Sequence, residues 1–228
     1  MQYRFEATSP EGFIQQIATN YLPHGYWFYV SGWVPKGKEP SLIDIKLTDK
    51  YGICISRQAR ARRKVAGLAN LHYIRYERFF VLLATHGKHP FFAEELANIR
   101  DIRRIPIKFG GHSLSYKQGG FLRREGGGEA VADEKWHSRV QIERDRYTEL
   151  KAYFLDIACR RSPDYLGRQL LNLPFEPYAP VRQQLLNLLR LINKRRHASG
   201  LERLAPDVLR YQRRIVRPFD IPGTAHAA

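Results

Sequence analysis

Residues 56–89 constrain the fold of this chain more than any other stretch, because they predict a helix and a strand pair in direct succession. Ser56 stands where a helix N-cap is expected, and good helix formers follow it. Beyond residue 70 the pattern predicts two strands with a tight reversal near Glu77 and Arg78, and the second strand, residues 79–83, is apolar throughout. A continuous apolar strand is typical of burial on both faces, so this pair predicts the centre of a sheet.

The helix predicted after Ser56 is strongly basic. Within two turns it carries Arg57, Arg60, Arg62, Arg63 and Lys64. The whole chain of 228 residues has 38 Lys and Arg against 22 Asp and Glu, a formal net charge of +16. Two segments hold this excess: residues 51–110 have twelve basic and four acidic side chains, and residues 151–228 have fourteen and six. So large an excess indicates a polyanionic partner, and we expect a nucleic acid.

The order of the predicted elements indicates an α+β fold. After a first helix, strands are expected at residues 26–34, 41–47 and 53–55, before the basic helix and the central pair. A helix at 91–103 and strands at 107–117 and 138–142 follow, and beyond them only helices are predicted, one capped by Ser162 and one at 181–197. We expect a mixed or antiparallel sheet domain in residues 1–145, with a ferredoxin-like arrangement as one candidate. An all-helical basic extension in 146–219 and a disordered tail in 220–228 complete the prediction.

The two cysteines, Cys54 and Cys159, are far apart and lack the spacing of metal ligands. Their apolar or helical contexts predict buried free thiols, which fit a reducing cytoplasm. The first residues lack the pattern of a signal peptide, and no apolar run reaches the length of a membrane span. We therefore expect a cytoplasmic protein without a membrane partner.

One catalytic hypothesis uses histidines and a tyrosine. His86 and His89 follow the apolar strand, and with His112 or His137 they are candidate ligands for a metal such as Mg²⁺ or Mn²⁺. Tyr147 or Tyr153 on a later helix would attack phosphorus. This arrangement is similar to the HUH family of rolling-circle initiators and single-strand transposases. That resemblance implies a histidine pair on a central strand of a ferredoxin-like sheet, and a metal-dependent nickase. The family has one bulky apolar residue between the histidines, whereas this chain has two residues there.

A second catalytic hypothesis uses carboxylates. Asp44 and Lys46 share one face of the strand expected at 41–47, and Glu11 lies on the first helix. The Asp-x-Lys triplet resembles the second half of the PD-(D/E)xK nuclease signature, in which a carboxylate holds magnesium and the lysine aids the attacking water. The resemblance implies a metal-dependent nuclease with these residues at its centre.

A third hypothesis requires no catalysis. Aromatic residues interleaved with arginines would form a stacking surface for single strands: Tyr26, Trp27, Tyr29, Trp33, Tyr73 and Tyr76. Beyond the basic helix, the cations expected to contact phosphates are Arg75, Arg190, Lys194, Arg195, Arg196, Arg210, Arg213 and Arg214. A structural subunit of a ribonucleoprotein is a further alternative. We expect a protein that binds DNA or RNA, within a mobile element or a nucleic-acid processing complex that contains other proteins.

Overall fold

The computed structural model describes residues 3–119, 122–123, 131–173, 177–209 and 216–219. It divides the chain into two compact units. Unit 1 comprises Met1–Ile107, Leu114–Ser138 and Val216–Ala228, and unit 2 comprises Lys108–Ser113 and Arg139–Ile215. Helices and antiparallel strands both contribute, so the predicted α+β class is confirmed. Arg210, Arg213, Arg214 and the predicted tail lie outside the described residues.

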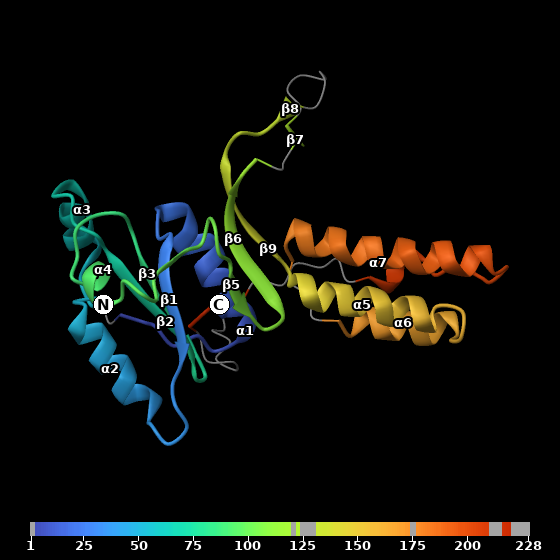
Figure 1. The fold of residues 1–228 in the computed structure, drawn as a ribbon, viewed down its shortest axis with the longest axis horizontal. Helices are drawn as coiled ribbons and strands as arrows, with labels where there is room; N and C mark the ends of the chain where they lie inside the picture. Colours follow the sequence, from blue (N-terminus) through green and yellow to red (C-terminus); the bar gives the residue numbers. More distant parts are fainter. Residues whose placement is uncertain (1–2, 120–121, 124–130, 174–176, 210–215, 220–228) are drawn as a thin grey trace, which may run out of the picture. The chain divides into compact units, whose positions relative to one another are not determined.

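A four-stranded antiparallel sheet forms the centre of unit 1 (Figure 1). Its strands are β1 (Phe28–Trp33), β2 (Leu71–Tyr76), β3 (Phe79–Ala84) and β4 (Arg100–Asp101), in the order β2-β3-β1-β4. The register pairs Tyr76 with Phe79, and Glu77 has a left-handed φ of 50°. The predicted strand pair and its tight reversal are therefore confirmed, and β3 lies between two strands as its apolar sequence requires.

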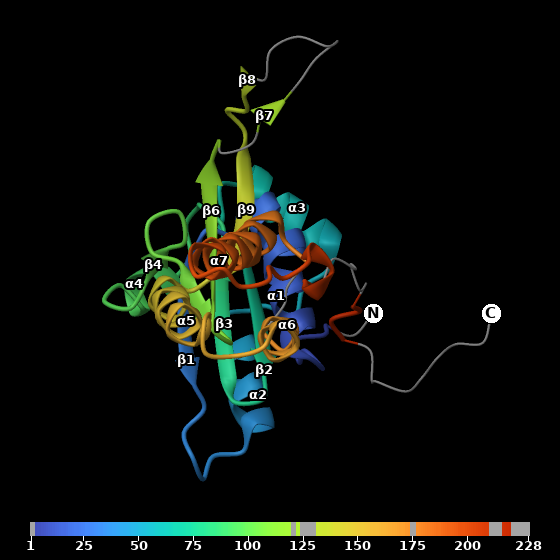
Figure 2. The ribbon, with the colours of Figure 1, turned by 90° about the vertical axis from the view of Figure 1, so that its right-hand side faces the viewer.

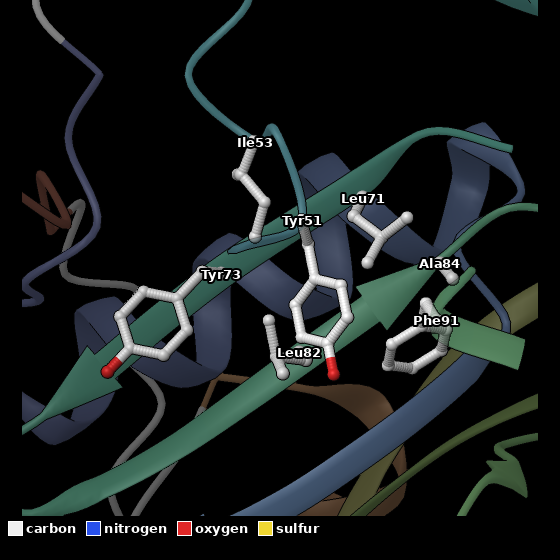
Figure 3. Packing of buried hydrophobic residues seen from close by; sticks show 7 residues of the cluster. All are labelled: Tyr51, Ile53, Leu71, Tyr73, Leu82, Ala84 and Phe91. Carbon is white, nitrogen blue, oxygen red and sulfur yellow. The ribbon is translucent and has the colours of Figure 1, made fainter. Parts of the chain in front are cut away.

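Helical segments cover both faces of this sheet because each face presents apolar side chains. On one face lie α1 (Pro10–Gln15) and the π-helical turn Gln16–Tyr21, where the ring of Phe13 packs 5.8 Å from that of Phe79. On the other lie α2 (Pro40–Lys50) and α4 (Phe91–Glu94). Figure 3 shows the core cluster on this second face: Tyr51, Ile53, Leu71, Tyr73, Leu82, Ala84 and Phe91. Burial of this apolar surface stabilises the sheet.

The prediction of a strand at residues 41–47 is wrong, because this segment belongs to helix α2. Pro40 occupies the first turn, where its fixed φ suits a helix. The buried side chains are Asp44 and Thr48, which lie one helical turn apart, whereas Leu42 and Ile45 are 65% and 56% exposed. The alternation of apolar residues is misleading because this helix buries polar side chains and leaves apolar ones in solvent.

Two further elements differ from the prediction. Residues 53–55 are not a strand: the N–H of Ile53 donates to the carbonyl of Thr48, which ends α2 in a turn. The helix expected at 91–103 stops at Glu94, and Arg100–Asp101 instead pairs with β1 as β4. The free edge of β1 offers backbone hydrogen bonds, and these outweigh the helical preference of the segment.

The described part of unit 2 contains three α-helices that run side by side, and Figure 2 looks along their axes. They are α5 (Arg144–Ile157), α6 (Pro163–Leu171) and α7 (Ala179–Ala198). Ser162 caps α6, since its hydroxyl oxygen accepts the N–H of Tyr165 at 3.3 Å. The predicted cap and the long amphipathic helix are confirmed, because capping and helical periodicity are local properties.

Shorter strands complete the described chain: β5 (Ile107–Phe109), β6 (His112–Gln118), β7 (Leu122–Arg123), β8 (Val131–Ala132) and β9 (Trp136–Ile142). A second sheet has the order β5-β6-β9, and β7 pairs with β8. The strand expected at 107–117, with an interruption at Gly110 and Gly111, is observed as β5 and β6, because these glycines, with φ of 57° and 77°, make a turn between them. In the described part of the chain, no helix has the length and apolar character needed to cross a membrane. Both thiols are exposed, so the prediction of buried cysteines is wrong.

Candidate nucleic-acid interface

Helix α3 (Arg57–Val65) is anchored to unit 1 by two of its arginines. Ser56 caps it as predicted, accepting the N–H of Ala59 at 3.1 Å. The guanidinium of Arg60 donates to the carbonyls of Ile53 and Leu71, each at 2.6 Å. Arg63 donates to the carbonyl of Ala69 at 3.1 Å. Both side chains therefore hold the helix in place, which differs from the free phosphate contacts expected for them.

The other cations of α3 face solvent. Arg57, Arg62 and Lys64 are exposed, and α3 carries no acidic residue. None of the three belongs to an ion pair among the described residues. Like charges this close on one short helix repel each other unless an anion neutralises them. The arrangement is therefore a set of exposed cations on an anchored helix, open to a polyanion.

The far end of α3 is joined to the turn that follows β3. The N–H of Ala69 donates to the carbonyl of Lys88 at 3.1 Å, and the N–H of Lys88 donates to the carbonyl of Gly67 at 3.0 Å. Gly87 makes this approach possible, since its φ is 136° and a Cβ there would lie 2.6 Å from the nitrogen of Ala69. The exposed side chain of Lys88 is thereby held beside the end of α3 and extends the basic surface.

Gly87→Ala is expected to lower the free energy of unfolding by about 2 kcal/mol. Alanine would have to adopt the left-handed backbone conformation of Gly87, and its Cβ would clash with the backbone of Ala69. Gly52→Ala is the matched control: Gly52 also has a left-handed φ, of 55°, but no atom lies within 4 Å of an added Cβ. The control is expected to cost only about 1 kcal/mol. Chemical denaturation of both variants measures the difference, and equal costs would contradict the tight junction.

The candidate metal ligands have different surroundings. His86 is exposed, whereas the Nδ1 atom of His89 accepts the N–H of Phe91 at 3.1 Å, and burial together with Arg63 lowers the pKa of His89. His112 belongs to unit 2, where it is 3% exposed and its Nδ1 donates to the carbonyl of Gly110 at 3.2 Å. No group of three or more His, Cys, Asp or Glu side chains placed to hold a metal occurs among the described residues.

Asp44 and Lys46 do not share a face. They lie two positions apart on helix α2, where Asp44 is 1% exposed and Lys46 is in solvent. Asp44 accepts hydrogen bonds from Tyr73 at 2.5 Å and from Arg75 at 2.8 Å. The carboxylate is thus part of a buried ion pair that joins α2 to β2. Asp44 and Lys46 therefore do not lie side by side on a strand, as the Asp-x-Lys nuclease hypothesis requires. Arg75, expected to contact phosphate, is 4% exposed and serves the same pair.

Neither candidate tyrosine nucleophile is activated by its surroundings. The hydroxyl of Tyr147 donates to the carbonyl of Gln184 at 3.2 Å, and burial raises the pKa of Tyr147. A hydrogen bond with Tyr165 raises the pKa of Tyr153, which is 41% exposed. An attacking tyrosinate needs a lowered pKa or an adjacent base. Both tyrosines belong to unit 2, and the histidine pair belongs to unit 1.

Unit 2 has an exposed basic surface of its own, on helix α7. Arg190, Lys194 and Arg195 are in solvent, as the sequence predicts for phosphate contacts. Arg196 is 3% exposed instead, and its guanidinium donates to the carbonyls of Ala158 and Arg161 at 2.8 and 2.9 Å and to that of Glu202. A side chain with these partners faces the interior of unit 2, which differs from the exposed phosphate contact expected for it.

The aromatic side chains expected to form a stacking surface have mixed positions. Tyr26, Tyr29 and Tyr73 are buried, whereas Trp33 is 67% exposed and Trp27 is half-buried. Tyr3, Tyr21 and Tyr26 instead surround His72, whose pKa is lowered to about 3, chiefly by burial and also by Arg60. This neutral histidine packs between β2 and the π-helical turn Gln16–Tyr21.

A row of nearly parallel rings lies elsewhere in unit 1. The ring of Trp27 is 5.8 Å from that of Tyr116 at an angle of 25°, and Tyr116 is 5.7 Å from Trp136 at 22°. The guanidinium of Arg103 lies 4.5 Å from the centre of Trp27. Trp136, at the end of the row, is 44% exposed. We call Arg103, Trp27, Tyr116 and Trp136 the stacking row.

Of this row, the sequence pattern indicates only Trp27 as a stacking residue. Tyr116 lies in the strand expected at 107–117, whose alternation can place an aromatic residue on an outward face, whereas Trp136 precedes the strand expected at 138–142. Their proximity depends on β6 and β9 being neighbours, which no local pattern shows. No protein-family model, curated protein or solved structure matches the chain.

Proposed function

We propose that the protein binds nucleic acid through the exposed cations of helix α3. The observation that carries this proposal is the set formed by Arg57, Arg62 and Lys64, which point into solvent from a helix whose other two arginines fasten it to the sheet. Neutralising a phosphate chain releases its counterions, and the anchored helix already holds the backbone of these cations in place before they bind it. The net charge of +16 supplies long-range attraction for the same partner.

The arrangement of unit 1 supports the finer fold expectation. Between β1 and β4 the chain runs strand, helices, two strands, helix and strand, and the sheet order is β2-β3-β1-β4. We propose that this part is ferredoxin-like, a βαββαβ arrangement. Helices α5 to α7 would then form the basic helical extension, with Arg190, Lys194 and Arg195 as its phosphate contacts. Metal-dependent cleavage of nucleic acid has less support than binding alone. Asp44 is ion-paired with Arg75, and the pKa values of Tyr147 and Tyr153 are raised.

Replacing Arg57, Arg62 and Lys64 together by glutamine is expected to weaken binding of a short labelled oligonucleotide by at least about tenfold at 0.1 M salt. The slope of log affinity against log salt should fall by about three, one for each lost phosphate contact. Fluorescence anisotropy at several salt concentrations measures both quantities. The melting temperature should stay nearly unchanged, because these side chains are exposed and make no ion pair among the described residues.

The matched control replaces Lys36, Lys38 and Lys46, which are equally exposed, by glutamine. It removes the same charge from other parts of unit 1. If the two triple variants lose affinity equally, only net charge matters and α3 is not the binding surface. If the wild-type protein binds no oligonucleotide, single-stranded or duplex, the proposed function is wrong.

A further inference from the structure

The stacking row ends in an indole that the fold leaves open. Trp136 is 44% exposed, whereas Tyr116 behind it is 7% exposed and Trp27 is half-buried. We propose that an unpaired base of a single-stranded nucleic acid stacks on Trp136, so that unit 1 prefers single strands to duplexes. This inference rests on the proposed function and adds to it the class of nucleic acid. Every base has a π-face, so the contact requires no particular sequence.

The row differs from most aromatic packing in unit 1 by its parallel rings, and from the parallel stack of Tyr3, His72 and Tyr21 because it ends in an exposed ring. Most aromatic pairs in the core of unit 1 are tilted or edge-on, such as Phe13 against Phe79 at 63°. In the row, two successive contacts are within 25° of parallel. At its inner end, Arg103 is fixed over Trp27 by a bidentate pair with Asp101, at 2.9 and 2.7 Å. A base on Trp136 would continue this stack in the same orientation.

The row is connected to the basic surface by contacts within unit 1. The guanidinium of Arg103 lies 5.9 Å from the centre of Phe28, and the ring of Phe28 lies 6.2 Å from that of His86. His86 is exposed and stands two residues before Lys88, which is hydrogen-bonded to the end of α3. The inner end of the row and the turn that carries Lys88 therefore lie at the same end of the central sheet, where Phe28 pairs with Ala84. A single strand can offer phosphates and unstacked bases to such a surface together, whereas a duplex keeps its bases paired.

Trp33 provides an internal control. It is 67% exposed, more than Trp136, but it lies at the opposite end of β1, about 17 Å from Phe28 at 3.4 Å per residue. Its ring meets Phe79 at 56°, a tilted contact rather than a parallel one. Exposure alone would make Trp33 the better platform, whereas the parallel row and its connection to α3 select Trp136.

The test compares Trp136→Ala, Trp136→Phe and Trp33→Ala with the wild-type chain. The probes are a single-stranded oligonucleotide, a blunt duplex of equal length, and an abasic phosphodiester chain of equal length. Trp136→Ala should weaken single-strand binding about five- to 150-fold, the loss of one stacked base, while the duplex and the abasic chain bind as before. Trp136→Phe should retain most of the affinity, Trp33→Ala all of it, and the salt slope should be unchanged in all three.

The affinities of the wild-type protein for the three probes provide a test that does not depend on how the variants fold. It should bind the single strand at least about fivefold more tightly than the abasic chain. Equal affinity for the two chains, or an equal loss in Trp33→Ala and Trp136→Ala, would overturn the base site while leaving α3 as the binding surface. Failure of the proposed function looks different, because the wild-type protein would then bind none of the three probes.

Discussion

Asp44→Ala is expected to lower the free energy of unfolding by about 3–5 kcal/mol, because it leaves the guanidinium of Arg75 buried without its main partner. Asp44 Oδ1 accepts the Nε of Arg75 and Oδ2 accepts its Nη2, both at 2.8 Å. The side chain of Arg75 is 5% exposed, and its remaining carboxylate contact is Glu6 at 3.1 Å, which is 61% exposed and weakly held. The hydroxyl of Tyr73 would lose its acceptor as well.

Urea denaturation measures this loss, and Asp49→Ala is the control. Asp49 is an exposed carboxylate on the same helix α2, so its removal should change stability by less than about 0.5 kcal/mol. The double variant Asp44→Leu with Arg75→Met should recover part of the loss, because apolar residues replace both charges while the hydroxyl of Tyr73 still lacks its acceptor. A small effect in Asp44→Ala would mean that water reaches Arg75. A catalytic role for Asp44 would instead leave stability intact and abolish metal-dependent cleavage.

Arg196→Met should destabilise unit 2 by about 3–4 kcal/mol, because three carbonyl groups lose a charged donor inside the protein. The guanidinium of Arg196 joins Ala158 and Arg161, which follow the end of α5, to Glu202, which follows α7. The carbonyl end of a helix attracts a cation, which explains how this charge is buried without a carboxylate partner among the described residues. Methionine retains the apolar stem but offers no donor to these oxygens.

Hydrogen exchange of the α5 and α7 amides, together with thermal unfolding, measures this effect. The matched control is Arg195→Met, one residue earlier on the same helix and exposed. Arg195→Met should leave stability unchanged and weaken oligonucleotide binding if α7 contacts phosphates. Should Arg196→Met weaken binding without faster exchange in α5, the inward position of this arginine would be contradicted.

Elements that depend only on neighbours along the chain can be predicted from the amino-acid order. Ser56 and Ser162 cap their helices because an N-cap needs only a side-chain oxygen and the following N–H groups. The reversal at Glu77 and the apolar strand after it predict the β2–β3 pair, and the periodicity of residues 181–197 predicts α7. The net charge depends on composition alone and indicates a polyanionic partner, which remains a prediction.

Contacts between distant segments determine which charged and aromatic side chains are free. Asp44 is helical and buried because Arg75, 31 residues away, neutralises it, and no pattern around Asp44 contains that partner. Arg60 and Arg196 resemble their exposed neighbours in sequence, yet carbonyl groups from other segments turn them inward. The stacking row forms only because β6 and β9 are adjacent strands. Local periodicity indicates which face a residue occupies, whereas the desolvation of a charge or ring depends on partners that only the folded chain brings together.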